Sequence, residues 1–266
     1  MVRHSLSILV LSAFVTSSAF AAVTSNPNAT SKATSKQISE ESLARKRNLL
    51  TIEMIGSSSS ISLDGTTTAT VGSSSVSVNG NGSLSGTSPV QGIALGFTGK
   101  PTSSFGLEGN IAYITKKFDQ AEYNGKPDSD NDTDASTKIS TVRAAGLARF
   151  YPSEYISFGA GMYASNYVGK VHETNRNGVE KDSSFDDTGM LNRFDYGTVF
   201  GARGEIPLSE SMAFVVDARY FLGFANLYNQ DKIVQELENM GATDVRVDQS
   251  GRTRDFQFGA GIGYSF

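Results

Sequence analysis

The last eleven residues of the chain alternate strictly between apolar side chains and small or polar ones. The apolar positions are Phe256, Phe258, Ala260, Ile262, Tyr264 and Phe266. A period of two predicts a β-strand with one apolar face and one small, polar face. Because chain termini fray in water, two aromatic residues at the very end of a soluble sheet would be unusual. A strand whose outer face meets lipid in a closed barrel explains the pattern better.

The other end of the chain has the features of a secretory signal peptide. A short basic start precedes an apolar stretch over residues 5–15, and Ala19-Phe20-Ala21 has the small-x-small pattern of a cleavage site. The alternative is a membrane anchor, but the apolar stretch is too short to span a bilayer. We therefore expect residues 1–21 to be removed by cleavage near Ala21. Residues 22–48 are predicted to be a polar periplasmic linker, in which 39–47 could form one short helix.

The amino-acid composition further narrows the classes of protein to which the chain could belong. The chain has 27 glycines, 6 prolines and no cysteine, which suits all-β structure and excludes a disulfide scaffold. The net charge of −4 argues against nucleic acid as a partner. The mean hydropathy of −0.22 is compatible with a membrane barrel, because alternation hides the apolar face of each strand.

Residues 49–266 contain eight strand-like runs joined by connections of alternating length. The runs lie at 49–57, 89–98, 104–116, 138–151, 155–169, 193–206, 212–226 and 253–266. The short connections are 99–103, 152–154 and 207–211, and the long ones are 58–88, 117–137, 170–192 and 227–252. This pattern predicts an all-β fold, an eight-stranded antiparallel transmembrane β-barrel with short periplasmic turns and long extracellular loops.

Two of the long connections have features of their own. Residues 57–88 are rich in Ser, Thr and Gly, and we expect a flexible surface loop there. In the last connection, Ile233, Leu237 and Met240 recur at helical spacing and Gly241 fits a helix stop. The prediction is a small helix that docks on the barrel rim or binds a partner.

Three segments carry a family resemblance. They are Asn192 to Leu208, Phe214 to Tyr220, and the terminal strand. Together they resemble the small outer-membrane β-barrel (porin-like) family, which is related in architecture to the barrel of outer membrane protein A. The resemblance covers residues 49–266. It implies the barrel fold and a location in a membrane, and it says much less about an activity. It also implies that Phe266, with Phe258, Ile262 and Tyr264 of the same strand, is read by the barrel-insertion machinery during assembly.

The predicted lumen face carries balanced charges. The cluster comprises Glu53, Glu108, Arg143, Arg149, Arg203, Glu205, Asp217 and Arg219. An eight-stranded barrel is only wide enough for side chains to fill it, and charges buried there must be paired. The favoured interpretation is an ion-pair plug, and the alternative is a charged constriction of a narrow pore.

Two weaker candidates complete the set. The acidic loop 128–134 offers carboxylates at alternate positions, but Thr133 stands where an EF-type calcium loop needs glycine, so a solvated loop is favoured. His172 is the only histidine beyond the signal peptide, and no partner is fixed by spacing. We therefore expect no catalytic residues and no metal site.

These observations predict where the protein is located and say less about its activity. We expect a non-enzymatic protein without cofactors in the outer membrane of a Gram-negative bacterium, with a structural or surface-interaction role through its extracellular loops. The expected partners are outer-membrane lipid, the insertion machinery and an unidentified surface ligand. A small diffusion channel is the alternative, followed by a membrane-embedded lipid-modifying hydrolase or acyltransferase.

Overall fold

A computed structural model describes most of the region that was predicted to form the barrel. The described residues are 48–71, 74–118, 120–123, 126–127, 136–174, 180–184 and 192–266. They all belong to the second of the two units into which the chain divides, Ser42–Phe266. The predicted signal peptide, the predicted short helix in the linker and the acidic loop 128–134 lie outside the described residues.

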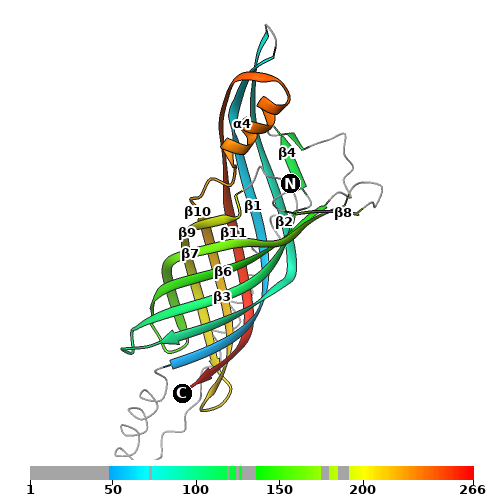
Figure 1. The fold of residues 1–266 in the computed structure, drawn as a ribbon. Helices are drawn as coiled ribbons and strands as arrows, with labels where there is room; N and C mark the ends of the chain where they lie inside the picture. The colour runs from blue at the N-terminus through cyan, green and yellow to red at the C-terminus, as the bar shows by residue number, and fades with distance from the viewer. Residues whose placement is uncertain are drawn as a thin grey trace, which may run out of the picture. The chain divides into compact units, whose positions relative to one another are not determined.

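Eight antiparallel strands form a closed barrel (Figure 1). They are β1 (Asn48–Val71), β2 (Ser74–Gly99), β3 (Phe105–Phe118), β6 (Ser136–Phe150), β7 (Ile156–Thr174), β9 (Phe194–Pro207), β10 (Met212–Gly223) and β11 (Ala242–Ser265). Each strand pairs with its neighbour in this order, and β1 closes the barrel by pairing with both β2 and β11. The short strands β4 (Gln120–Tyr123), β5 (Lys126–Pro127) and β8 (Glu180–Ser184) extend the sheet beside β2 and β7. The eight-stranded barrel predicted from the alternation is confirmed.

The two faces of the barrel differ as the alternation predicts. In β3, exposed and buried residues alternate along the whole strand, with apolar side chains outward and Glu108 inward. The same outward belt continues on the other strands, with side chains such as Ile52, Phe158 and Phe258 each about half exposed. An apolar face that is open around a closed barrel is suited to lipid, because no backbone group of the barrel wall needs water.

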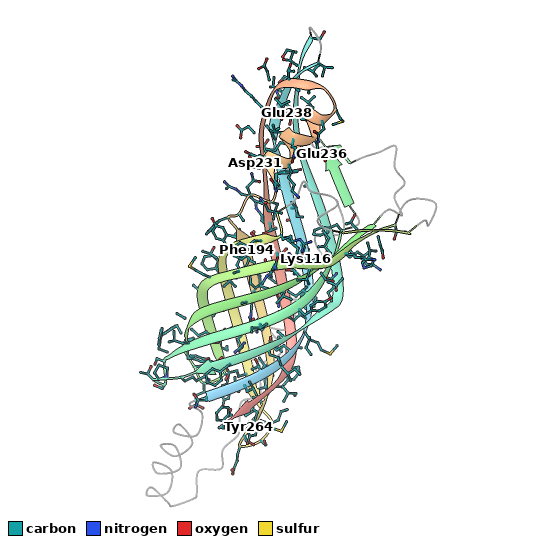
Figure 2. All side chains as sticks on the ribbon, in the orientation of Figure 1. Lys116, Phe194, Asp231, Glu236, Glu238 and Tyr264 are labelled. Atoms are coloured by element: carbon teal, nitrogen blue, oxygen red, sulfur yellow. The ribbon has the colours of Figure 1, made fainter. Side chains whose placement is uncertain are left out.

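Both ends of the barrel wall lie at its short-turn end. The amide of Phe266 donates to the carbonyl of Asn48 at 3.2 Å, and the amide of Ser265 donates to the carbonyl of Ser211 in the β9–β10 turn. The C-terminus therefore lies at the end opposite the longest connections, as Figure 1 shows. The terminal aromatic side chains face outward there, and Tyr264 is labelled in Figure 2.

The prediction of a flexible loop over 57–88 is wrong. β1 and β2 have 24 and 26 residues, against 14 in β3, and they continue as a regular hairpin far beyond the lipid-facing belt. The first half of β11 pairs with β1 along this extension, from Gly251 to Ala242. We call these three strand segments, Ser57–Val71, Ser74–Ser88 and Ala242–Gly251, the ribbon. Threonine and valine favour extended backbone. The central strand, β1, forms hydrogen-bond ladders with β2 and β11, which satisfy its backbone groups on both edges.

The helix predicted in the last connection is present as α4 (Gln230–Asn239). The side chain of Asn229 caps its first turn by accepting from the amide of Lys232, and Gly241 follows the helix with a φ of 88°. Ile233 is buried where α4 packs against the β11 part of the ribbon (Figure 1). The helix therefore docks on the ribbon and not on the barrel rim. In the described part of the chain, no helix is long and apolar enough to cross a membrane.

The close approach of β1 and β11 depends on Gly261. A Cβ at this position would lie 1.9 Å from the carbonyl oxygen of Ile52, so an alanine requires the strand backbones to move apart. We expect Gly261→Ala to destabilise the barrel by about 1–3 kcal/mol, as overpacking does. Heat-modifiable mobility on gels and chemical unfolding followed by circular dichroism measure this. Gly109→Ala is the matched control, because nothing lies within 4 Å of its added Cβ; equal effects of the two variants would contradict the prediction.

Candidate functional site

Six charged side chains meet inside the lower half of the barrel and form one connected network. We call them the lower cluster: Glu53, Glu108, Arg149, Arg203, Asp217 and Arg219. Arg203 lies at its centre. Its Nε donates to Asp217 Oδ2 at 2.8 Å, and its Nη2 lies 3.1 Å from Glu108 Oε1 and 3.2 Å from Glu53 Oε1. One guanidinium therefore bridges three carboxylates that come from three different strands.

The other two arginines complete the network. Arg219 donates from Nε to Asp217 Oδ1 at 2.7 Å and from Nη2 to Glu108 Oε1 at 2.9 Å. Arg149 bonds Glu108 through Nε and Asp217 Oδ2 through Nη2, the latter at 3.0 Å. Three arginines thus face three carboxylates, and the formal charge of the cluster sums to zero.

Strand alternation places these side chains in the lumen. Glu53 comes from β1, Glu108 from β3, Arg149 from β6 and Arg203 from β9, while Asp217 and Arg219 share the inward face of β10. Hydroxyl groups of Thr98 in β2 and Ser157 in β7 accept further hydrogen bonds from Arg203 and Arg149. The network therefore ties together every barrel strand except β11.

The lower cluster is closed to water. Arg149 and Arg203 have relative exposures of 0 % and 1 %, and Glu53 and Asp217 are each 2 % exposed. A continuous aqueous path along the lumen would have to pass these side chains and would expose them. Buried charges are tolerated only when they are paired and hydrogen-bonded, and each of these is. The geometry at this level is that of a plug.

A second group of polar side chains lies closer to the ribbon. We call it the upper cluster: Lys116, Arg143, Tyr163, Asp195, Thr253 and Asp255. Lys116 Nζ lies 2.5 Å from Asp255 Oδ2, and Arg143 bonds the same carboxylate oxygen. The Arg143 guanidinium also lies 4.0 Å from the ring centre of Phe221, a cation–π contact. Figure 2 labels Lys116 within the barrel wall below the ribbon.

The side chains of the upper cluster were only partly anticipated from the sequence. Arg143 was expected with the lower cluster, but it lies in the upper one. Lys116, Asp195 and Asp255 were not among the candidate residues. The alternation of inward and outward residues could have identified them. Lys116 shares the inward face of β3 with Glu108, and Asp255 shares the inward face of β11 with Gln257.

Glu205, the remaining predicted lumen residue, lies at the short-turn end. It forms an ion pair with Lys100 at 3.0 Å, and the ammonium group also lies 4.1 Å from the ring centre of Tyr151. This pair is separate from the lower cluster and more open, with side chains 12 % and 11 % exposed.

Apolar layers separate and cover the two charged clusters. The layer between the clusters is formed by Ala145, Leu147, Val199, Phe221 and the ring of Tyr163, whose hydroxyl group belongs to the upper cluster. Another layer, toward the ribbon, is formed by Ile61, Phe118, Ile139, Tyr167 and Leu227. The lumen is therefore filled in alternating charged and apolar layers from the short-turn end to the base of the ribbon.

The remaining candidates lie on the outside. Phe258, Ile262, Tyr264 and Phe266 are between 36 % and 58 % exposed on the outer surface of the terminal strand. His172 is exposed at the upper edge of β7, where its Nδ1 lies 2.6 Å from Asp182 Oδ1. Within the described residues, no three His, Asp or Glu side chains are grouped to hold a metal ion.

The closed strand pairing, the outward apolar belt and the filled, charged lumen define an eight-stranded antiparallel β-barrel whose outer face is suited to lipid. Neither the protein-family models nor the curated protein sequences give a match to the chain.

Comparison with solved structures finds barrels of the same class. The outer membrane protein OprG of Pseudomonas aeruginosa is 13 % identical and has a TM-score of 0.41, with 84 % of this chain and 97 % of OprG covered. Ail, the attachment invasion locus protein of Yersinia pestis, is 14 % identical with a TM-score of 0.36, covering 83 % and 99 %. Neisserial surface protein A is 11 % identical with a TM-score of 0.32, covering 82 % and 97 %. The likeness is one of fold alone.

Arg203 is the most informative position for testing the plug. When Arg203 is replaced by alanine, the guanidinium group nearest to the Glu53 carboxylate is that of Arg219, 3.9 Å away. The negative charge of Glu53 then stays buried with only a distant positive charge to offset it. We expect a loss of about 3–5 kcal/mol in the free energy of unfolding. Adding Glu53→Gln should recover part of it, because the uncompensated charge is then removed.

The measurement is guanidinium unfolding in detergent micelles, followed by circular dichroism because the chain has no tryptophan. Lys100→Ala is the control, since its ion pair is partly open to water and should cost less. A stable Arg203→Ala variant, or no recovery in the double variant, would show that the lower cluster does not act as a paired plug.

Proposed function

We propose that this protein is a non-enzymatic outer-membrane barrel that presents the ribbon and α4 at the cell surface for interaction with an external ligand. The observation that carries this proposal is the length of the three ribbon strands, 24 to 26 residues, in a barrel whose strand β10 has only 12. The ribbon segment of β1 alone extends about 45 Å along the strand. Such a projection contributes nothing to closing the barrel.

The ribbon is built as a firm platform. Its central strand pairs with β2 and β11 over nearly its whole length, and the outer edge of β11 is bonded at its base. Asn226 accepts from the amide of Gly251, and both Asn226 and Gln230 donate to the carbonyl of Gln249. Where the β11 edge is bonded in this way, it is protected against non-specific strand pairing.

The tip of the ribbon combines polar surroundings with a few open apolar side chains. Val71, Val76 and Val78 lie on the same face of the ribbon and are 51–56 % exposed, and Met240 at the end of α4 is 71 % exposed. Apolar side chains on an otherwise hydroxyl-rich surface are a common feature of interaction sites. Figure 2 labels the acidic residues Asp231, Glu236 and Glu238 along α4, set back from the end of the hairpin.

The competing function is a diffusion channel. The buried lower cluster favours the interaction role, because a pore of this width would have to separate ion pairs that are 0–2 % exposed. An enzymatic role would need a nucleophile or acid–base pair in a sheltered site. The His172–Asp182 pair is instead open to solvent, with side chains 57 % and 45 % exposed.

Shortening the ribbon tests the proposal. Asp64 and Asn81 are direct cross-strand partners, so residues 65–80 can be replaced by an Asn-Gly turn without changing register. Cells that display the full protein should adhere to at least one of a panel of immobilised glycans and matrix proteins, or to one another. Cells with the shortened protein should fall to the level of cells without it.

A triple variant, Val71→Ser, Val76→Ser and Val78→Ser, keeps the ribbon and removes its apolar tip. It separates a role of the tip from a role of the whole projection. Equal adhesion by the full and shortened proteins, or no adhesion by either, would contradict the proposal, provided that both fold and reach the surface.

A further inference from the structure

One face of the ribbon carries a polar hollow that spans its three strands. It is lined by Asp64 and Thr66 of β1, Asn79 of β2, and Asp248 and Ser250 of β11, together with two glycines. Its volume is about 480 Å³, and pockets for small ligands have about 300–1,000 Å³. Figure 1 shows the three strands running together above the barrel. We call this feature the ribbon hollow.

Strand register arranges the lining side chains in two rows. Asp64 lies directly opposite Ser250, and Thr66 lies between Asp248 on one side and Asn79 on the other. Direct cross-strand partners share a face of the sheet, as do residues two apart in one strand. The rows are therefore about 7 Å apart along the strands, with about 4.8 Å between neighbouring strands.

The ribbon hollow lies on the outward face. Asp248 and Ser250 continue the alternation that places Phe256 on the outside of the barrel. The valines of the ribbon tip lie on the opposite face, because Val78 is the partner of Thr67, which follows Thr66 in the strand. The hollow and the apolar tip are therefore two separate surfaces of the ribbon.

The floor of the hollow is backbone. A Cβ at Gly65 would lie 2.3 Å from the carbonyl oxygen of Asp248, so β1 and β11 approach more closely here than a side chain permits. The register between these two strands shifts between Thr68 and Thr70, and such a bulge bends the strand. Hydrogen-bond ladders on both edges of β1 hold this floor in place, so the hollow is formed before any ligand arrives.

The lining is chemically suited to hydrogen bonds. The carboxylates of Asp64 and Asp248 are exposed and accept only, whereas the side chains of Thr66, Asn79 and Ser250 both donate and accept. The Ser250 hydroxyl donates to the carbonyl oxygen of Asp64 at 3.4 Å and keeps its own lone pairs. The lining residues supply no aliphatic or aromatic surface on which an apolar ligand would be buried.

The charges around the hollow favour a neutral ligand. Two carboxylates in one hollow repel an anion. Arg246 and Arg252 occupy the next outward positions of β11 on either side and are both exposed, so the formal charges of these two arginines and of Asp64 and Asp248 sum to zero. Hydroxyl groups both donate and accept, so a ligand with adjacent hydroxyl groups matches carboxylate acceptors that lie beside guanidinium donors.

We propose that the ribbon hollow binds a neutral saccharide unit through its adjacent hydroxyl groups. Asp64 and Asp248 accept hydrogen bonds from these hydroxyl groups, and Thr66 and Asn79 complete the set. The inference names the ligand class of the proposed surface role and rests on that role, because only a ribbon outside the cell meets external glycans.

The test uses the full mature protein in micelles of a detergent without a sugar headgroup, since a maltoside would itself offer hydroxyl groups to the hollow. The probes are immobilised glucose, galactose and mannose, each in its neutral form, a sulfated form and a 2-amino-2-deoxy form. Binding is measured by biolayer interferometry. At least one neutral sugar should bind, its sulfated form should bind more weakly, and its amino form should bind no more tightly.

Two variants and a matched control locate the site. Hydrogen bonds to charged groups are strong, so Asp64→Asn and Asp248→Asn should each raise the dissociation constant of the neutral sugar roughly tenfold or more. Asp244→Asn is the control, because Asp244 is an exposed aspartate of the same strand outside the hollow. Its φ of 51° is a conformation that asparagine also adopts, and binding should not change.

A second pair of variants tests the hydroxyl contribution without changing charge. Thr66→Val keeps the shape of the side chain and removes one hydrogen-bonding group, so binding should weaken roughly five-fold. Thr87→Val is its control, because Thr87 is exposed and pairs with Ser58 nearer the barrel, outside the hollow.

Several results would overturn the proposal. Tightest binding of the amino forms would make the hollow a cation site, and loss of binding when EDTA removes divalent cations would make a metal ion the ligand of the aspartates. An equal loss in Asp244→Asn would reduce the effect to diffuse charge. Tighter binding to polysaccharide extracted from the expressing cells than to any of the three sugars would assign the hollow to the cell's own surface.

Failure of the saccharide site and failure of the surface role give different results. If none of the sugars binds while cells that display the protein still adhere through the ribbon, the saccharide site is rejected and the surface role stands. If the purified protein binds a neutral sugar and loses it in Asp64→Asn, but displaying cells do not adhere, the site stands and the surface role is rejected.

Discussion

Pairing of β1 with both β2 and β11 is the constraint on which the rest of the structure depends. It leaves no barrel strand with an open edge, which is the condition for a sheet to exist in lipid. A closed barrel of eight strands has an interior only wide enough for side chains, so the inward residues must fill it and satisfy one another. The lower cluster meets this condition with three arginines and three carboxylates drawn from five strands, and hydroxyl groups add two more.

The alternation of side chains made the barrel and much of its interior predictable. Every second residue of a strand shares a face, so a sequence that alternates apolar and polar residues specifies both the lipid face and the lumen face. Glu108 and Arg149, predicted from this rule alone, lie in the lumen in direct contact. The rule places side chains on a face but does not pair them, since pairing depends on register between strands that are distant in sequence. That is why Arg143 was grouped with the wrong carboxylates, although its partner Asp255 stands in the same alternating pattern.

The ribbon could not be predicted in the same way. Ten of the fifteen residues 57–71 are Ser, Thr or Gly. They occupy both faces of the strand, so the alternation of apolar and polar residues that marks the barrel strands is weak there. The β-branched residues at its tip, including Val76 and Val78, were the remaining clue to extended backbone. Once formed, the ribbon gives the molecule two parts: a barrel whose lumen is filled by side chains, and a three-stranded sheet that projects well beyond the apolar belt.

Single-channel recording of the purified protein in a planar lipid bilayer tests the central claim most directly, because a lumen closed by buried ion pairs should not conduct. The account predicts a bilayer current indistinguishable from that of protein-free membranes, in preparations whose insertion is verified by heat-modifiable mobility. Reproducible conductance steps, with an ion selectivity that changes when Arg149 or Arg219 is neutralised, would contradict it and establish the lower cluster as the constriction of a pore.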